Sequence, residues 1–238
     1  MQSKSARLTI LSVLLFLVLA PLTLMLSAKY LDSRSYYIPA IIIIIFSIIP
    51  FFVFFENRKI KSSEIVIVSM MIALAVASRA VFAFVPQFKP TCAIVIVTAI
   101  AFGPNVGFVT GSLSMLVSNL IFGQGMFTPF QMLGMGLVGF FCGLIFTKSR
   151  YRTDKLIVSI TGALLCFGVY GLIADTCSVL MFVTDYNRES VMSIFASGIP
   201  YNAIHAVTTG IILFFINKPM TDKFTRLRVK YGVFEIEN

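Results

Sequence analysis

The chain has 238 residues, of which 58% are hydrophobic and 12% are charged, and its mean hydropathy is +0.94. Soluble domains carry about 25% charged residues, so this composition excludes an ordinary soluble protein and indicates a membrane protein. The net charge of +9 does not indicate a nucleic-acid binder, because the basic residues stand in short clusters between apolar runs, as in loops that flank membrane helices.

Eight apolar segments are candidate membrane helices, since a helix needs about 20 apolar residues to cross the hydrocarbon core. They span residues 8–27, 36–55, 64–85, 91–103, 106–122, 129–146, 156–183 and 195–216. The fourth is short and ends at Gly103-Pro104, a pair that stops a helix and opens a turn. The predicted fold class is an all-α integral membrane protein.

The first segment has an alternative interpretation. Lys4 and Arg7 precede it, as in a secretory signal peptide, and Ser27-Ala28 would be the cleavage region. Its apolar stretch is longer than a typical signal core, which favours a retained helix with a kink at Pro21.

The distribution of lysine and arginine predicts the orientation. If the N-terminus is cytoplasmic, the cytoplasmic segments carry 14 of these residues and the outer segments carry 4, with Arg79 inside a span. We therefore expect a multi-pass protein of the plasma membrane with both termini in the cytoplasm.

The basic patch "ENRKIKSSE" divides the chain into parts of different character. Residues 1–60 hold two helices without ionisable residues in their spans, which predicts a transmembrane extension used for anchoring or packing. Residues 61–230 hold the glycines and the polar residues within spans, so they are expected to form the substrate-binding membrane domain. Residues 231–238 are a cytoplasmic tail.

Three ionisable residues, Arg79, Asp175 and His205, fall within the predicted spans. Each such group costs about 2.5–3.5 kcal/mol at the membrane centre and is a default site candidate. At 1.5 Å per residue they lie roughly 9, 12 and 15 Å below the outer ends of their spans. The alternatives are a structural Arg79–Asp175 ion pair, an Arg79 side chain that reaches the outer interface, and a His205 bonded to a neighbouring carbonyl.

Further polar residues gather at the predicted outer ends, which indicates a polar cavity that opens outward. The loop "FGQGMFTPFQM" contributes to it, although its glycines and proline also suit a simple turn. Phe127 and Phe130 could line a site for a flat ligand or lie at the membrane interface. The predicted substrate-binding residues are Arg79, Lys89, Asn119, Gln124, Phe127, Gln131, Asp175, Asn202 and His205.

Small residues recur every fourth position in the third span, at Ser69, Ala73 and Ala77. Such a row lets another helix approach closely, so it is a candidate partner-docking face; close packing within the chain is the alternative. A second row, Gly134, Gly136, Gly139 and Gly143, is expected to pack internally.

Several kinds of chemistry have no motif in this sequence. There is no Walker loop, HExxH, GxSxG or paired carboxylates, and the four cysteines lack metal-binding spacing. We therefore expect no enzyme activity, no metal and no bound cofactor.

From about Glu64 to Lys230 the chain resembles the substrate-specific (S) components of energy-coupling factor (ECF) vitamin transporters. Four stretches carry the resemblance: "MMIALAVASRAVF", "PQFKPTCAIVIVTAIAFGPNVGF", "GSLSMLVSNLIFGQGMFTPFQMLGMGLVGFFCGLIF" and "IPYNAIHAVTTGIILFFINKPM". The resemblance implies a six-helix bundle, here preceded by two extra helices, that captures a vitamin at the outer face. Ala73 and Ala77 match the alanine motif by which the family contacts its scaffold.

The resemblance also implies partners: one transmembrane scaffold subunit and two ATPase subunits, which use the ATP. The front helices are similar to an extension in S components assigned to cobalamin, so a cobalamin-like cargo is the substrate prediction. Two other functions stay open, namely a stand-alone proton-coupled carrier that uses Arg79, Asp175 and His205 as a relay, and a structural membrane protein without ligand.

Overall fold

The structure, a computed structural model, describes residues 61–183 and 187–233, and all its regular elements there are helical. They are α3 (Ser62–Val81), α4 (Thr91–Phe102), α5 (Pro104–Phe122), α6 (Thr128–Phe146), α7 (Lys155–Leu165), a π-helical turn (Cys166–Tyr170), α8 (Gly171–Phe182) and α9 (Arg188–Tyr231). The π turn joins α7 and α8 into one continuous span of 28 residues. The predicted all-α fold is therefore confirmed.

Five helices in the described ranges are long and apolar enough to cross a membrane, and α4 is shorter. With α4 included they reproduce the six spans predicted after residue 60. The predicted front helices, 8–27 and 36–55, lie outside the described residues.

Helix α4 forms the centre of the bundle. All 12 of its residues are buried, and its apolar side chains pack against others from α5, α6, α7 and α9 in one cluster. It ends at Gly103, whose φ of 105° lies in the left-handed region that glycine adopts without steric cost. Pro104 then starts α5 at a position where its missing N–H has no helical partner to lose.

Helices α5 and α6 pack through glycines at backbone contact distance. A Cβ added at Gly139 would lie 2.5 Å from the carbonyl oxygen of Gly107, and one added at Gly111 would lie 2.5 Å from that of Met135. The predicted internal role of the α6 glycine row is thus confirmed for Gly139. Close packing of this kind supplies the dispersion contacts that hold helices together where lipid removes the hydrophobic driving force.

The third span is shorter than predicted, because α3 ends at Val81 and not at residue 85. Beyond it, the Lys89 ammonium donates to the carbonyl oxygens of Phe82 (3.1 Å), Ala83 (3.4 Å) and Val85 (3.5 Å). These bonds satisfy carbonyls that a continuing helix would otherwise use. The loop residues after Val81 are apolar, so their hydropathy is the same as that of a helix end, and hydropathy alone could not place the end of α3.

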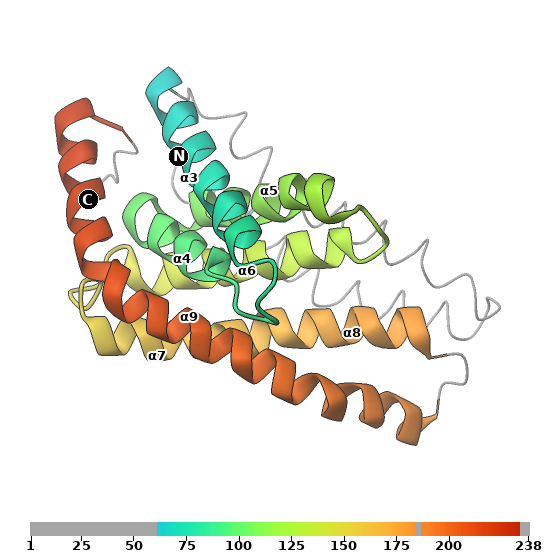
Figure 1. Cartoon of the computed structure of the whole chain (residues 1–238). Coiled ribbons are helices and arrows are strands. Elements are labelled where there is room, and N and C mark those ends of the chain that lie inside the picture. Colours follow the sequence, from blue (N-terminus) through green and yellow to red (C-terminus); the bar gives the residue numbers. More distant parts are fainter. Residues whose placement is uncertain (1–60, 184–186, 234–238) are drawn as a thin grey trace, which may run out of the picture.

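The last span is longer than predicted, since α9 runs over 44 residues instead of 195–216. Asn187 caps its start by accepting a hydrogen bond from the Ser190 amide, and the helix continues through Pro200 and Pro219. Its end packs beside the start of α3, where Lys61 donates to the Gly232 carbonyl (Figure 1). The helix therefore continues past the predicted end of the span at residue 216 as far as Tyr231.

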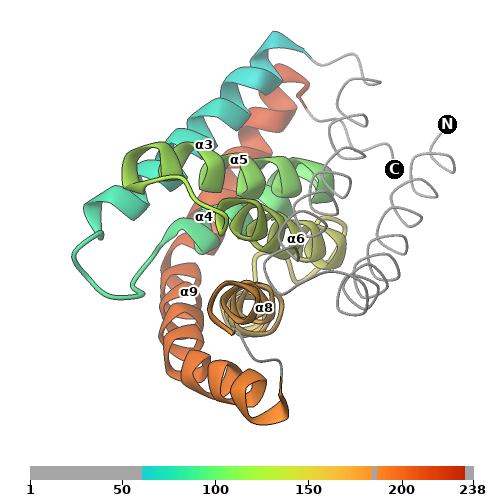
Figure 2. The same cartoon turned by 90° about the vertical axis from the view of Figure 1, so that its right-hand side faces the viewer.

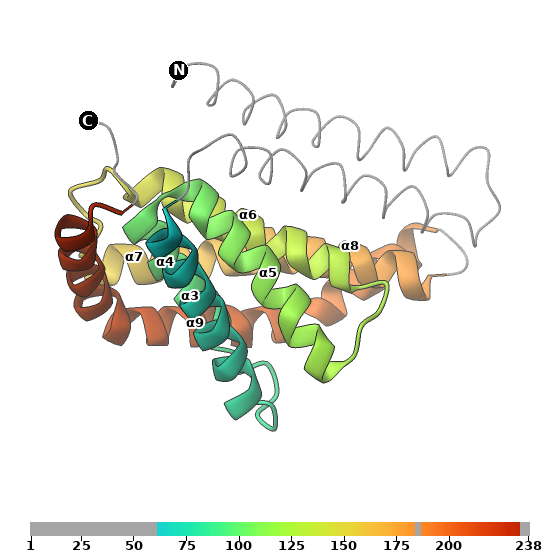
Figure 3. The same cartoon turned by 90° about the horizontal axis from the view of Figure 1, so that it is seen from above.

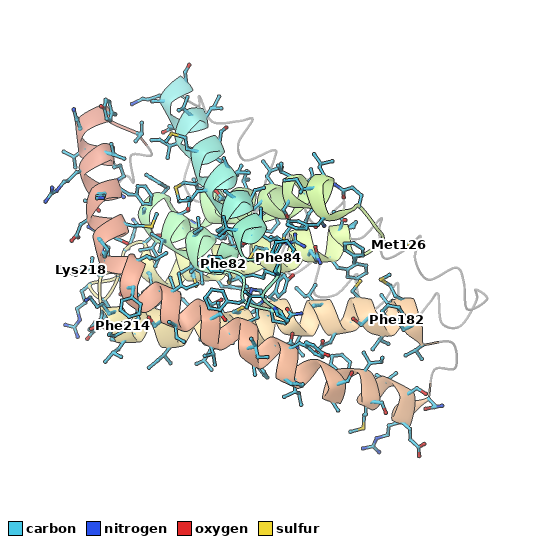
Figure 4. The ribbon with its side chains drawn as sticks, viewed as in Figure 1. Phe82, Phe84, Met126, Phe182, Phe214 and Lys218 are labelled. Atoms are coloured by element: carbon cyan, nitrogen blue, oxygen red, sulfur yellow. The ribbon has the colours of Figure 1, made fainter. Side chains whose placement is uncertain are left out.

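The two ends of the bundle are distinguishable in Figure 4, where Met126 and Phe182 lie at one end and Phe214 and Lys218 at the other. Helix α3 runs at a steep angle to α6, α8 and α9 (Figure 3), and Phe82 and Phe84 lie about midway along the bundle (Figure 4). Figure 2, which looks nearly along α8, shows α9 passing along one side of the bundle.

The contact between Gly139 and the Gly107 backbone predicts that position 139 does not accommodate a side chain. We expect Gly139→Ala to lower the free energy of unfolding by about 1–3 kcal/mol, because the added methyl group meets backbone atoms that cannot move aside. Thermal unfolding in detergent measures this. The control is Gly168→Ala, where an added Cβ meets nothing within 4 Å; equal losses from both variants would contradict the account.

Candidate functional site

Arg79 lies in the last turn of α3 and reaches α5. Its Nη1 donates to the Ser118 hydroxyl and, over 2.8 Å, to the Asn119 Oδ1. The guanidinium carbon lies 5.1 Å from the centre of the Phe122 ring, a cation–π distance. The guanidinium is therefore held in one place by neutral groups of α5.

Asn119 connects three helices. It is 1% exposed, and its Nδ2 donates to the Thr128 hydroxyl and to the Gln131 Oε1 on α6, both over 3.0 Å. A buried amide must find partners for its donors and acceptor, and Asn119 does so with Arg79 on one side and α6 on the other. We call Arg79, Ser118, Asn119, Thr128 and Gln131 the arginine cluster.

The glycine-rich loop between α5 and α6 closes over this cluster. Gly123 has a φ of 102°, and the Gly125 amide donates to the Thr128 hydroxyl over 3.2 Å. Gln124 is exposed and donates to the Leu116 carbonyl over 3.0 Å. The backbone conformation of the turn thus accounts for Gly123, and the turn also places the Thr128 hydroxyl where it accepts a hydrogen bond from Asn119.

The two aromatics of this segment contribute to packing. Phe130 is buried, and Phe127 packs beside it against the same apolar cluster of α5, α6 and α8 residues. A Cβ at Gly125 would lie 2.4 Å from the Phe127 ring, so that glycine makes room for the ring.

A second polar pair lies between α8 and α9. Asn202 Nδ2 donates to Asp175 Oδ2 over 2.8 Å, and both side chains are partly exposed. A Cβ at Gly198 would lie 2.3 Å from Asp175 Oδ1, and one at Gly171 would lie 2.8 Å from the Asn202 amide carbon. The two glycines therefore create the space that these polar groups fill.

His205 lies next to the π turn. Its ring meets the Tyr170 ring edge-on at 5.2 Å between centres. His205 is 6% exposed, and its Nε2 is buried without a hydrogen-bond partner in the part of the chain that the structure describes. Single π turns inside α-helices are frequent at functional sites, and a buried polar atom without a partner is available to a ligand or a water molecule.

The structure brings the predicted site residues together in groups rather than as one contact network. Arg79 donates a hydrogen bond to Asn119, Asn119 donates one to Gln131, and Asn202 donates one to Asp175. The alternative of an Arg79–Asp175 ion pair is wrong, since each has other partners. Tyr170 lies beside His205, since the two rings meet edge-on.

Sequence reasoning missed Ser118, Thr128 and Tyr170. Hydroxyl residues are common in membrane helices, and nothing in their spacing separates these from the many others. Thr128 carried one available signal, because it follows the glycine-rich loop at the start of α6.

The described residues contain no group of three His, Cys, Asp or Glu side chains that could hold a metal ion.

The small-residue row of α3 faces away from the bundle. Ser69, Ala73 and Ala77 are all exposed, while Ala75 and Val76 on the same helix are buried. The alternative of packing within the chain therefore does not hold among the described residues. The row is open to a partner or to lipid.

Comparison with known proteins decides the family. A family model described as "ECF-type riboflavin transporter, S component" matches residues 59–222. The chain belongs to this family. Neither the curated proteins nor the solved structures gave a match. Membership makes this S component a multi-pass membrane protein and a substrate-binding subunit of a vitamin transporter, which is not itself an enzyme.

The arginine cluster predicts that Asn119 stabilises the S component. Asn119→Leu keeps the size of the side chain but leaves Arg79 and Gln131 without their amide partner, so we expect the free energy of unfolding to fall by about 1–3 kcal/mol. The exposed Gln124→Leu is the control in the same thermal unfolding assay. An Asn119→Leu protein as stable as this control would show that the cluster is not structural.

Proposed function

We propose that this S component captures riboflavin or a closely related flavin at the outer face of the membrane and delivers it to an ECF module. The observation that carries the proposal is the family match along residues 59–222, which includes every residue of the polar groups described above. The orientation follows the lysine and arginine distribution.

The polar groups suit a cargo of this kind. Riboflavin combines a flat ring system, whose edge donates and accepts hydrogen bonds, with a hydroxyl-rich chain. Gln131 on α6, and Asn202 and the His205 Nε2 on α9, offer donors and acceptors, and the Tyr170 ring lies beside His205. Ligand sites combine apolar walls with a few convergent polar groups in this way.

Riboflavin replaces cobalamin as the proposed cargo. The suggestion of cobalamin came from the two front helices, which lie outside the described residues, whereas the matched family is named for riboflavin. S components with one fold bind unrelated vitamins, so the fold alone does not select the cargo.

The exposed α3 row supports a docking role. We propose that Ser69, Ala73 and Ala77 meet the transmembrane scaffold subunit, whose two ATPase partners supply the energy of transport. The neighbouring Met70 and Leu74, which are 66% and 45% exposed, flank the row with apolar surface for that helix–helix contact.

A proton-coupled carrier is less well supported. A relay needs a continuous chain of exchangeable protons, and Arg79, Asp175 and His205 do not hydrogen-bond to one another among the described residues. A purely structural protein is disfavoured by membership of a family of substrate-binding subunits.

The binding proposal predicts that the purified S component alone binds riboflavin. Titration with riboflavin, followed by quenching of flavin fluorescence, should saturate at one flavin per chain, with Tyr170 and His205 near the flavin. Tyr170→Leu should weaken binding at least tenfold, or by about 1.4 kcal/mol. Phe167→Leu, an exposed aromatic of the same π turn, is the control. Absence of flavin binding by the folded wild-type chain would refute the proposal.

The docking proposal predicts a separation of functions. Ala77→Trp should abolish co-purification with the scaffold and ATPase subunits while riboflavin affinity is retained, because Ala77 faces away from the polar groups. The control is Leu172→Trp, which puts the same bulk on an exposed position of α8 (58% exposed). A complete ECF complex formed with Ala77→Trp would show that the α3 row is not the contact.

A further inference from the structure

The last part of α9 changes direction and lies across one end of the bundle (Figure 1). Lys218 is near this turn (Figure 4), and Pro219 follows it within the helix. A proline inside a helix removes one backbone hydrogen bond and bends the helix. We call residues 219–231 the terminal segment.

The inner side of the terminal segment is packed on the end of α4. The Phe224 ring lies 5.1 Å from the Phe102 ring, measured between centres, and Arg228 Nη1 donates to the Ala101 carbonyl over 3.2 Å. Because Ala101 and Phe102 are the last residues of α4, the segment covers the turn between α4 and α5. These contacts fix which of its side chains face outward.

The outer side of the terminal segment carries a row of cations. Lys223, Arg226 and Lys230 are spaced three and four residues apart, so they lie on one side of the helix, and all three are exposed. We call them the basic stripe. None of them forms an ion pair with another residue in the ranges 61–183 and 187–233, and the one carboxylate of the segment, Asp222, lies 3.7 Å from Lys218.

The surroundings of the stripe are also positive. Asn217 Nδ2 donates to the Arg152 carbonyl over 3.2 Å, which places the loop between α6 and α7, with its three cations and one carboxylate, beside the start of the terminal segment. Glu235 and Glu237 follow in the sequence, outside the described residues, and the chain from residue 218 onward stays net positive when they are included.

Apolar and aromatic side chains accompany the stripe. Val229 is 79% exposed and Tyr231 is 55% exposed, and the Lys230 Nζ lies 5.2 Å from the centre of the Tyr231 ring. Cations beside aromatic and apolar groups on one helix are typical of a helix that lies in the membrane interface. Water would leave Val229 without an apolar contact, whereas the boundary between headgroups and acyl chains accommodates both kinds of side chain.

We propose that the terminal segment is an interfacial helix whose basic stripe binds the headgroups of anionic phospholipids in the cytoplasmic leaflet. The distribution of lysine and arginine puts this end of α9 on the cytoplasmic side, where anionic lipids attract basic segments next to membrane helices. The assignment does not depend on which cargo the chain binds.

A single fluorescent reporter tests the proposal. The chain has no tryptophan, so Val229→Trp introduces one at an exposed position. The full chain is placed in vesicles of phosphatidylcholine and phosphatidylglycerol, in which one lipid or the other carries bromine atoms that quench tryptophan fluorescence. At equal mole fraction, brominated phosphatidylglycerol should quench at least about twofold more strongly, because each lysine or arginine near an anionic surface favours the contact about fivefold. Added salt should reduce this difference.

Charge variants of the reporter protein locate the effect. Replacing the whole basic stripe with glutamine should bring quenching by the two lipids to the same level. A matched control removes three exposed cations from the same side of the membrane and should keep most of the difference. It consists of Lys148→Gln, Arg150→Gln and Lys155→Gln. Thermal unfolding selects the variants that are folded.

A second reporter position controls for general contact with lipid. Ile211 is 52% exposed and lies within the span of α9, away from the terminal segment. Ile211→Trp should be quenched equally by the two brominated lipids at low and high salt.

Three outcomes would overturn the proposal. Equal quenching of Val229→Trp by the two lipids at low salt excludes a preference for anionic headgroups. A difference that survives neutralisation of the basic stripe overturns the assignment to these three residues. Quenching by aqueous iodide and by neither lipid shows that the segment faces the cytosol, where an acidic soluble protein would be its partner. The assay contains no flavin, so its result is independent of the proposed cargo.

Discussion

The structure depends on the rule that a polar side chain among apolar helices must be satisfied by other protein groups. Asn119 shows how the rule shapes the bundle, because this buried amide links Arg79 on α3 to Thr128 and Gln131 on α6. Each partner in turn fixes a feature of the fold, namely the last turn of α3, the glycine-rich loop and the start of α6. The charge of Arg79 is thereby held at a defined place without a carboxylate.

The apolar part of the bundle supplies the rigidity on which that network relies. Helix α4 is buried along its whole length, and α5 and α6 approach until glycine backbones touch. Such contacts leave no room for sliding, so the side chains of α5 and α6 keep their register. By contrast, the α8–α9 pair carries Asp175 and Asn202 in spaces made by Gly171 and Gly198, and these polar groups are partly exposed. The bundle therefore combines a tightly packed half with a half that carries partly exposed polar groups.

Much of the fold was predictable from the sequence, because the lengths of the apolar segments and the positions of helix-stopping residues define the helices. Gly103-Pro104 marked the boundary between α4 and α5, and the glycine-rich loop marked that between α5 and α6. The end of α3 and the length of α9 were not predictable. The former depends on Lys89 capping carbonyls across a loop, and the latter on a helix that continues through two prolines.

The candidate site was predictable as a set of residues and not as a set of contacts. Polar residues at similar depth on several spans were identified, yet depth does not say which helices are neighbours. For this reason the sequence suggested Asp175 as an ion-pair partner of Arg79, whereas Arg79 donates hydrogen bonds to Ser118 and Asn119. Hydroxyl groups such as Thr128 and rings such as Tyr170 acquire a role only through their neighbours, which the sequence does not display.

The central claim is that the polar groups of α6, α8 and α9 open to the outer side of the membrane. Impermeant maleimide labelling of single cysteines in intact cells tests it, and the native Cys92, Cys142, Cys166 and Cys177 are all buried. Gln131→Cys and Asn202→Cys should react from outside and be protected by riboflavin, while Lys218→Cys should react only after permeabilisation. Reaction of Gln131→Cys and Asn202→Cys only after permeabilisation would contradict the account.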